Sequence, residues 1–374
     1  MSNRHLAAMP SATLYERESS VEDVARRCGI DAGRVLDFSL NINPFGPPPR
    51  SREAARGALD RAHEYPDVGL ADLRRRVAGW HGVPGDALVF GDGLDEVIKL
   101  LVHAWTDEGD RVLIHIPTFP RYELEVGARG AVPVPVRSDP PWAPDLAAMA
   151  RALEAAPTAL AFLCTPNNPT SAEIATADIE RLAAGFPATM FVVDEALIFP
   201  PEVGAAPLLA GRRNVAVLRT FSKYFGLAGL RVGYVVADPA RLALVEMVRP
   251  PFNVSGLAAA AAVAAMDDDE FLESSRRAFH REAAFLRDAL GGLDGCRIHG
   301  GDSNMLLLAL EGVSSPALVE ALVRRGILVV DGRTFNGLED RDTIRVSIRD
   351  RAANEALAHA LRAVWPGLRG RADG

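Results

Sequence analysis

Between Ala87 and Asp238 the chain alternates short apolar runs, rich in β-branched residues, with segments of helical periodicity. This alternation is typical of βαβ units, because parallel strands need a crossover that covers a face of the sheet. Strands are expected at 87–90, 111–116, 132–136, 159–163, 190–193, 215–218 and 231–236. Helices are expected at 95–105, 145–155, 178–184 and 239–248. The pattern predicts an α/β fold with a mainly parallel sheet flanked by helices.

The pattern changes after Arg249-Pro250-Pro251. A helical region at 256–290 is followed by expected strands and helices that predict a smaller α+β domain, with strands at 304–310, 327–330 and 343–348 and helices at 316–324 and 354–365. The first fifty residues hold an amphipathic helix, 21–27, and a proline-rich arm, 43–49, of a kind that packs on another domain or subunit. We expect three parts: an N-terminal arm and helix, 1–50, a large α/β domain, 51–250, and a small C-terminal domain, 251–374.

Charge and composition exclude several classes of protein. A net charge of −8 argues against a nucleic-acid or acidic-membrane partner, because phosphate backbones are bound through clustered Lys and Arg. No apolar run approaches the roughly 18 residues of a membrane span, and Met1–Pro10 lacks the apolar core of a targeting segment. Cys28, Cys164 and Cys296 are odd in number and widely spaced, so we expect no disulfide framework, no metal site and a cytoplasmic location.

The strongest chemical signal is a lysine in a glycine-rich segment directly after an expected buried strand. The segment is Arg219–Tyr234, RTFSKYFGLAGLRVGY. Burying the ammonium of Lys223 is costly unless a partner or a lowered pKa relieves it, and a Schiff base resolves that cost. Ser222 and Arg231 add a hydroxyl and a guanidinium suited to a phosphate. The segment favours a covalent cofactor site over a surface lysine in a turn.

Other polar or glycine-rich motifs follow neighbouring strands, where ligands of open α/β sheets bind. Asp194 ends an apolar strand and could pair with a pyridine nitrogen, although a strand-end acid can equally cap a loop. Asn168 follows another strand and could bond a phenolic oxygen, although it also fits an Asn-Pro turn. The turn at 91–96 opens a helix whose first N–H groups suit a phosphate, and Phe119 offers a ring to stack on the pyridine.

Together these motifs resemble the pyridoxal-5′-phosphate (PLP) enzymes of fold type I in the aminotransferase class I/II superfamily, over residues 37–364. Within it, 219–234 with RPPFNV at 249–254 is similar to histidinol-phosphate aminotransferases. The N-terminal part, 21–49, including LDFSLNINP at 36–44, resembles the threonine-phosphate decarboxylases. The resemblance implies a PLP fold type I large domain with a smaller C-terminal domain.

The resemblance also implies a role for individual residues. Lys223 is the Schiff-base lysine and Asp194 contacts the pyridine nitrogen, and both are catalytic. The other cofactor contacts it implies are Asn168 on the phenolic oxygen, Phe119 on the ring face, and Leu94, Asp95, Ser222 and Arg231 on the phosphate. Tyr65 matches a tyrosine that reaches the phosphate of the neighbouring subunit, which implies a homodimer with shared active sites. Arg345 and Asn43 are the implied substrate contacts.

Departures from the aminotransferase pattern leave the reaction open. Leu197 stands where a tyrosine is usual, Ile42 replaces a glutamate, and Val330 replaces an arginine, for which Arg333 is a possible substitute. We expect an aminotransferase that acts at the α-carbon of an amino acid or amino phosphate. The alternative is a PLP-dependent decarboxylase or lyase, including a tailoring enzyme of specialised metabolism.

Overall fold

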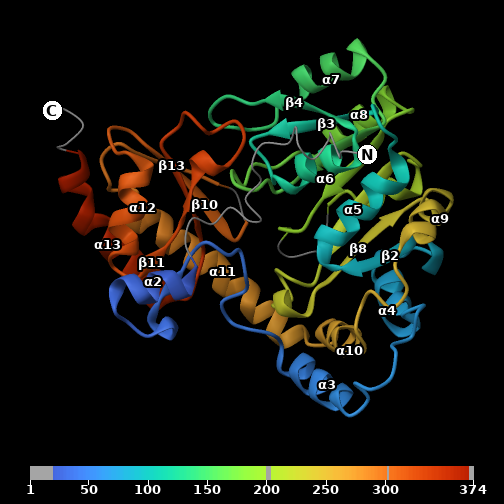
Figure 1. Ribbon diagram of the computed structural model, residues 1–374, viewed down its shortest axis with the longest axis horizontal. Coiled ribbons are helices and arrows are strands. Elements are labelled where there is room, and N and C mark those ends of the chain that lie inside the picture. The colour runs from blue at the N-terminus through green and yellow to red at the C-terminus, as the bar shows by residue number, and fades with distance from the viewer. Residues whose placement is uncertain (1–19, 199–203, 301–302, 370–374) are drawn as a thin grey trace, which may run out of the picture.

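The computed structural model describes residues 20–198, 204–300 and 303–369. Its largest sheet has seven strands in the order β2-β8-β7-β6-β5-β3-β4 (Figure 1). Their bounds are β2 Leu88–Asp92, β3 Arg111–Ile116, β4 Val132–Arg137, β5 Leu160–Cys164, β6 Met190–Asp194, β7 Val215–Thr220 and β8 Val232–Ala237. Strands β3 to β7 pair in parallel, and β8 is antiparallel to both of its neighbours. The predicted mainly parallel sheet is confirmed.

Helices cover both faces of this sheet, because successive strand residues point to opposite sides. Ile114 packs in the cluster formed with α5 (Gly93–Trp105), α6 (Arg121–Arg129) and α9 (Pro239–Val248). The preceding residue, Leu113, points to the other face of the sheet and packs in the cluster formed with α7 (Leu146–Ala155) and α8 (Thr176–Gly185). Near β2 and β8 the sheet is covered by α4 (Ala71–His81) and α10 (Gly256–Ala265), and α10 packs against α3 (Pro49–Leu59).

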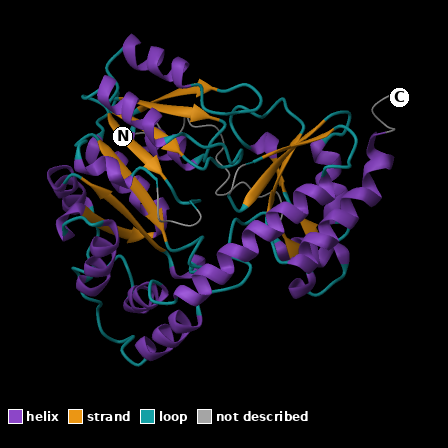
Figure 2. Ribbon diagram, turned by 180° about the vertical axis from the view of Figure 1, so that it is seen from behind, coloured by secondary structure: helices purple, strands orange, loops and turns teal. Residues whose placement is uncertain are grey.

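A second, antiparallel sheet has the strand order β12-β13-β10-β9 and lies apart from the large sheet (Figure 2). Its strands are β9 Cys296–His299, β10 Met305–Leu310, β12 Val330–Asp331 and β13 Thr343–Ser347, and its helices are α11 Asp269–Leu290, α12 Ser315–Val323 and α13 Arg351–Arg369. The strand β1 (Leu36–Asp37) pairs in parallel with β11 (Ile327–Leu328). The smaller α+β part is confirmed.

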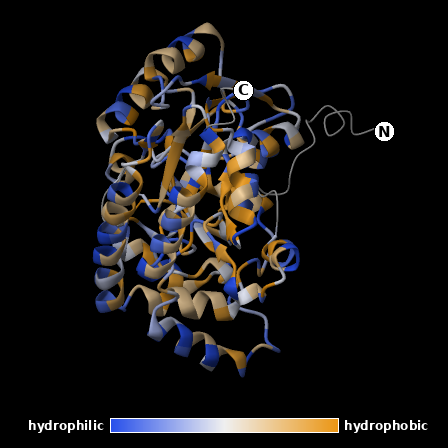
Figure 3. Ribbon diagram, turned by 90° about the vertical axis from the view of Figure 1, so that its left-hand side faces the viewer, coloured by the Kyte–Doolittle hydropathy of each residue, from blue (hydrophilic) through white to orange (hydrophobic). Residues whose placement is uncertain are grey.

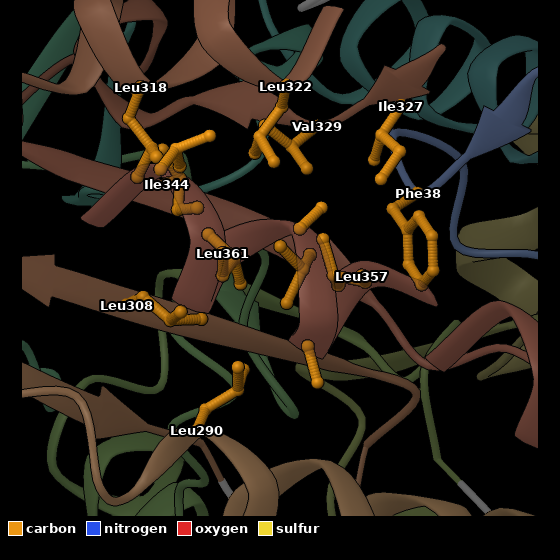
Figure 4. Packing of buried hydrophobic residues seen from close by; sticks show 14 of the residues in the cluster. Phe38, Leu290, Leu308, Leu318, Leu322, Ile327, Val329, Ile344, Leu357 and Leu361 are labelled. Carbon is orange, nitrogen blue, oxygen red and sulfur yellow. The ribbon is translucent and has the colours of Figure 1, made fainter. Parts of the chain in front are cut away.

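The N-terminal helix α2 (Val21–Cys28) and the segment after β1 belong to the core of this smaller part. Phe38 points toward Ile327 and Leu357 within one apolar cluster (Figure 4). By contrast, α10 packs in the core beside β2 and β8 of the large sheet. The division of the chain at residues 50 and 250 stays a prediction.

The helical region expected at 256–290 is two helices separated at 266–268, and the strand expected at 327–330 is split between β11 and β12. Helices α3, α4 and α6 and strands β1 and β9 were not predicted, and each of them is only partly buried. The strands in the interior are mainly hydrophobic, whereas the helices around them carry both hydrophobic and hydrophilic residues (Figure 3). Every helix of the described residues is too short or too polar to cross a lipid bilayer. Met1–Pro10, expected to carry no targeting signal, lies outside the described residues.

Candidate active site

The carboxyl ends of the parallel strands meet at one edge of the large sheet, where a pocket of about 380 Å³ opens. Asp194, Cys164 and Thr220 end β6, β5 and β7, and all three line it. Strand β2 runs in the same direction as β7, so the start of α5 reaches the same edge. The predicted residues that line the pocket are Leu94, Asp95, Phe119, Asn168, Asp194, Ser222, Lys223 and Arg231.

One end of the pocket has the donors that a phosphate requires. Helix α5 begins at Gly93, whose φ is +75°, and a Cβ atom there would lie 2.0 Å from Nη2 of Arg231. The same guanidinium lies 3.5 Å from the Ser222 hydroxyl and 3.3 Å from Oδ2 of Asp95. The positive end of the helix dipole and a guanidinium therefore meet beside a hydroxyl, which suits a dianionic phosphate.

The floor of the pocket holds a buried carboxyl group. Asp194 is 3% exposed. The Tyr122 hydroxyl donates to its Oδ2 at 2.6 Å, and the N–H of Ala196 donates to Oδ1 at 2.9 Å. Burial raises the pKa of Asp194, while these two hydrogen bonds and the nearby charge of Lys223 lower it. A buried carboxylate facing a pocket suits a protonated ring nitrogen.

Tyr122 was missed by sequence reasoning, because its partner lies 72 residues away and only strand order brings the two together. The sequence signal was its position three residues after Phe119. Phe119 and Tyr122 meet edge to face, with ring centroids 5.7 Å apart. The ring predicted to stack on the cofactor is therefore in contact with the tyrosine that bonds Asp194.

Arg345 is fully buried behind the pocket rather than in its lining. Its guanidinium donates to Oδ1 of Asn168 and to the carbonyl of Ser39, both at 2.6 Å, and lies 5.5 Å from the Phe335 ring centroid. Since the Asn168 carbonyl oxygen is held by Arg345, its amide nitrogen is left to donate elsewhere. Asn168 thus links the predicted substrate arginine to the pocket.

Two predicted residues lie away from the pocket lining. Asn43 donates to the Tyr224 carbonyl at 3.1 Å and to the Ser275 hydroxyl at 2.8 Å, so it fastens the N-terminal arm to the segment after Lys223. Tyr65 is 83% exposed and stacks on Phe252 with ring centroids 4.6 Å apart. Their roles toward substrate and toward a second subunit stay predictions.

The residues that depart from the aminotransferase pattern shape the pocket wall. Ile42 and Leu197 both line it. Val330 is buried in a small apolar cluster, and Arg333 forms an ion pair with Asp342 at 2.7 Å. Among the described residues that line the pocket, the cationic side chains are those of Lys223 and Arg231.

Comparisons with known proteins identify the family of the whole chain. The family model "Aminotransferase class I and II" matches residues 33–361. A histidinol-phosphate aminotransferase from Symbiobacterium thermophilum is 38% identical over 93% of this chain and 95% of its own. The histidinol-phosphate aminotransferase from Sinorhizobium meliloti, solved with PLP, superposes with a TM-score of 0.86 at 24% identity, covering 97% of both chains.

A decarboxylase has a similar structure. The L-threonine-O-3-phosphate decarboxylase from Porphyromonas gingivalis superposes with a TM-score of 0.73 at 26% identity, covering 88% of this chain and 99% of its own. The family match spans both sheets and every strand that contributes to the pocket. The donor set described above fits the cofactor of that family, with a helix end for its phosphate and a buried carboxyl for its ring nitrogen. The chain belongs to the aminotransferase class I and II family of PLP-dependent enzymes.

Proposed function

We propose that this chain is an aminotransferase that bonds PLP through Lys223 and takes the amino group from an amine that carries an acidic group. The observation that carries the proposal is the meeting of Lys223, Asp194 and the N-terminal end of α5 in one pocket of about 380 Å³. When bound, PLP supplies an electron sink for the charge that develops at the substrate α-carbon. The protein supplies the groups that hold the reactants and move the proton.

Each pocket residue has a separate task in this proposal. The Nζ atom of Lys223 would take the proton from the substrate α-carbon and deliver it to the aldehyde-derived carbon of the cofactor, as transfer of the amino group requires. Asp194 accepts a hydrogen bond from the protonated ring nitrogen, and Phe119 packs on the ring face. Arg231 and Ser222 hold the phosphate together with the first N–H groups of α5.

Histidinol phosphate is the amine that we propose as substrate, following the relatives that match most of the chain. The buried guanidinium of Arg345, bonded to Asn168 beside the pocket, supports an acidic group on the substrate. Purified protein loaded with PLP is mixed with histidinol phosphate and with a panel of amino acids, while absorbance follows conversion of the cofactor from its aldehyde to its amine form. Conversion with histidinol phosphate is expected. If only other amines converted the cofactor, histidinol phosphate would not be the substrate. If no donor converted the cofactor, transamination would be refuted.

Decarboxylation is a second candidate, favoured by the apolar side chains of Ile42 and Leu197 in the pocket wall. A substrate carboxylate placed against these two apolar side chains would be poorly solvated, which favours its loss as carbon dioxide. The similarity to a threonine-phosphate decarboxylase adds support. The same panel tests it: release of carbon dioxide without conversion of the cofactor to its amine form would favour this reaction.

We predict that Leu197→Tyr will lower the midpoint pH of the colour change of bound PLP by about one to two pH units. Leu197 lines the pocket, and a tyrosine there would donate to the phenolic oxygen of the cofactor and stabilise its anion. A pH titration of the visible absorbance measures the midpoint. Leu197→Phe is the matched control, since it adds the ring without the hydroxyl. Equal midpoints in the two variants would contradict the prediction.

A homodimer with shared sites is part of the proposal. Five exposed apolar residues lie on the segment after α3 and at or just after the end of α9, and we call them the dimer patch: Tyr65, Val68, Met247, Val248 and Phe252. The two segments are joined, since Arg249 donates to the Val68 carbonyl at 3.3 Å. Exposed apolar residues that lie together on a protein surface often mark a protein–protein interface, so this patch supports the proposed dimer.

We predict that Met247→Glu will convert the dimer to a monomer in light scattering and reduce activity, because a charge is placed in the dimer patch. Met247 is 81% exposed in the single chain, so folding itself should tolerate the change. Val132→Glu, at an exposed apolar residue of the edge strand β4, is the control and should leave both unchanged. If Met247→Glu had the same mass as wild type, the dimer patch would not be the interface.

A cytoplasmic location completes the proposal. All three cysteines, Cys28, Cys164 and Cys296, have free thiols. A chain whose thiols stay unpaired fits a reducing compartment, where disulfides are rare.

A further inference from the structure

Tyr122 is a buried tyrosine whose hydroxyl has no task in the reaction described so far. It lies in the first turn of α6, with no solvent exposure. Its hydroxyl donates to Oδ2 of Asp194 at 2.6 Å, while the N–H of Ala196 donates to Oδ1 at 2.9 Å. Each carboxylate oxygen therefore accepts one hydrogen bond from the protein and keeps a lone pair for another donor.

Aromatic packing fixes the direction of this hydroxyl. The Tyr122 ring is stacked on Phe162, with ring centroids 4.4 Å apart and an interplanar angle of 11°. It meets Phe119 edge to face at 5.7 Å and 83°. Phe162 is itself fully buried in β5, so the phenol cannot turn away from Asp194 without opening the core. Burial also raises the pKa of Tyr122 well above its usual range, which keeps the hydroxyl a donor.

The groups around Asp194 act on its ionisation in opposite directions. Burial raises the pKa of the carboxyl most, and the charge of Asp95 raises it further. The hydrogen bond from Tyr122 is the largest effect that lowers this pKa, ahead of the Ala196 N–H and the charge of Lys223. Without Tyr122, the buried anion would lose its main stabilising partner.

We propose that Tyr122 is a positioning residue that holds Asp194 as an oriented, ionised acceptor for the ring nitrogen of PLP. The inference rests on the proposed contact between Asp194 and that nitrogen. Without the Tyr122 hydrogen bond, the proton shared between the two moves toward the carboxyl, because the anion is less stable. The electron sink at the ring is then weaker, so removal of the α-carbon proton becomes slower.

The test is Tyr122→Phe, which keeps the ring and removes the hydroxyl. Wild type and variant are loaded with PLP labelled with ¹⁵N at the ring nitrogen, and nuclear magnetic resonance reports its protonation. We expect the variant resonance to move from the protonated toward the neutral pyridine range. The rate constant of the amine half-reaction should fall about ten- to one-hundred-fold.

Tyr234→Phe is the matched control. It removes a hydroxyl from a tyrosine that is only 1% exposed, but that hydroxyl lies 2.9 Å from Nε2 of His81 and outside the pocket lining. The control should leave the ¹⁵N resonance at the wild-type position. A Tyr122→Phe resonance at that same position, in a protein that binds PLP, overturns the proposal. A neutral ring nitrogen in wild type would instead refute the underlying contact with Asp194.

If Tyr122→Phe does not fold, 3-fluorotyrosine placed at position 122 provides a second measurement. Fluorine makes the phenol a stronger hydrogen-bond donor and barely changes its shape. We expect the ¹⁵N resonance to move further into the protonated range. An unchanged resonance in this protein would also overturn the proposed role of Tyr122.

Discussion

Replacing Lys223 with alanine will abolish covalent attachment of PLP and lower the amine half-reaction about 10²- to 10⁴-fold, the usual contribution of a positioned acid–base group. The chain has two lysines, and the other, Lys99, is on the exposed face of α5. No second amine can therefore replace Lys223 in the pocket, where it is the one lysine among the described lining residues. Visible absorbance of the loaded protein and the rate of conversion to the amine form measure the two effects.

Because the chain has two lysines, Lys99→Ala is a direct control for Lys223→Ala. Lys99→Ala should bind PLP with the wild-type spectrum and react at the wild-type rate. Borohydride reduction followed by peptide mass spectrometry should place the fixed cofactor on residue 223 in wild type and in Lys99→Ala. Label found at Lys99, or a coloured and active Lys223→Ala protein, would contradict the assignment.

Arg219→Met will reduce the free energy of unfolding by about 3–5 kcal/mol at neutral pH, the usual cost of removing one partner from a buried ion pair. Nη2 of Arg219 lies 2.6 Å from Oε2 of Glu195, and the two side chains are 5% and 1% exposed. Glu195 follows Asp194 directly, so this pair stabilises the loop at the end of β6 beside the pocket. Urea unfolding of the protein without cofactor measures the loss.

The loss of unfolding free energy caused by Arg219→Met should become smaller as the pH is lowered. Burial raises the pKa of Glu195, and the charge of Arg219 lowers it, so the variant raises the folded-state pKa further. A group with a raised folded-state pKa contributes stability at low pH that is lost as pH rises through that pKa. Arg219→Met therefore approaches wild-type stability as Glu195 takes up its proton. A deficit that is constant with pH would mean that lost packing, and not the unpaired carboxylate, causes it.

Two controls separate charge from packing in this experiment. Glu195→Leu combined with Arg219→Met removes both charges and should recover most of the loss. Arg213→Met removes an arginine that is 91% exposed and pairs with Asp238 at the surface. It should change stability little, because solvent screens such pairs.

Much of the site could be predicted because it depends on strand ends. Asp194 and Asn168 follow apolar runs, and Lys223 lies just past a third, so parallel pairing brings them to one edge whatever the loops do. The end of the pocket that we propose for the phosphate was equally predictable, because it consists of a glycine turn and the helix that this turn opens. Each of these patterns is local in the sequence, and the rule that ligands bind at the carboxyl ends of parallel strands brings them together.

What the order of amino acids determined by itself was the alternation of strands and helices, and with it the edge where the polar strand ends meet. Only the tertiary structure decided which distant side chains touch that edge. Tyr122 bonds Asp194 across 72 residues, and Arg345 bonds Asn168 across 177. Such contacts depend on how helices and the second sheet pack over the first, which is set by the packing of the whole core and leaves no periodic trace along the chain.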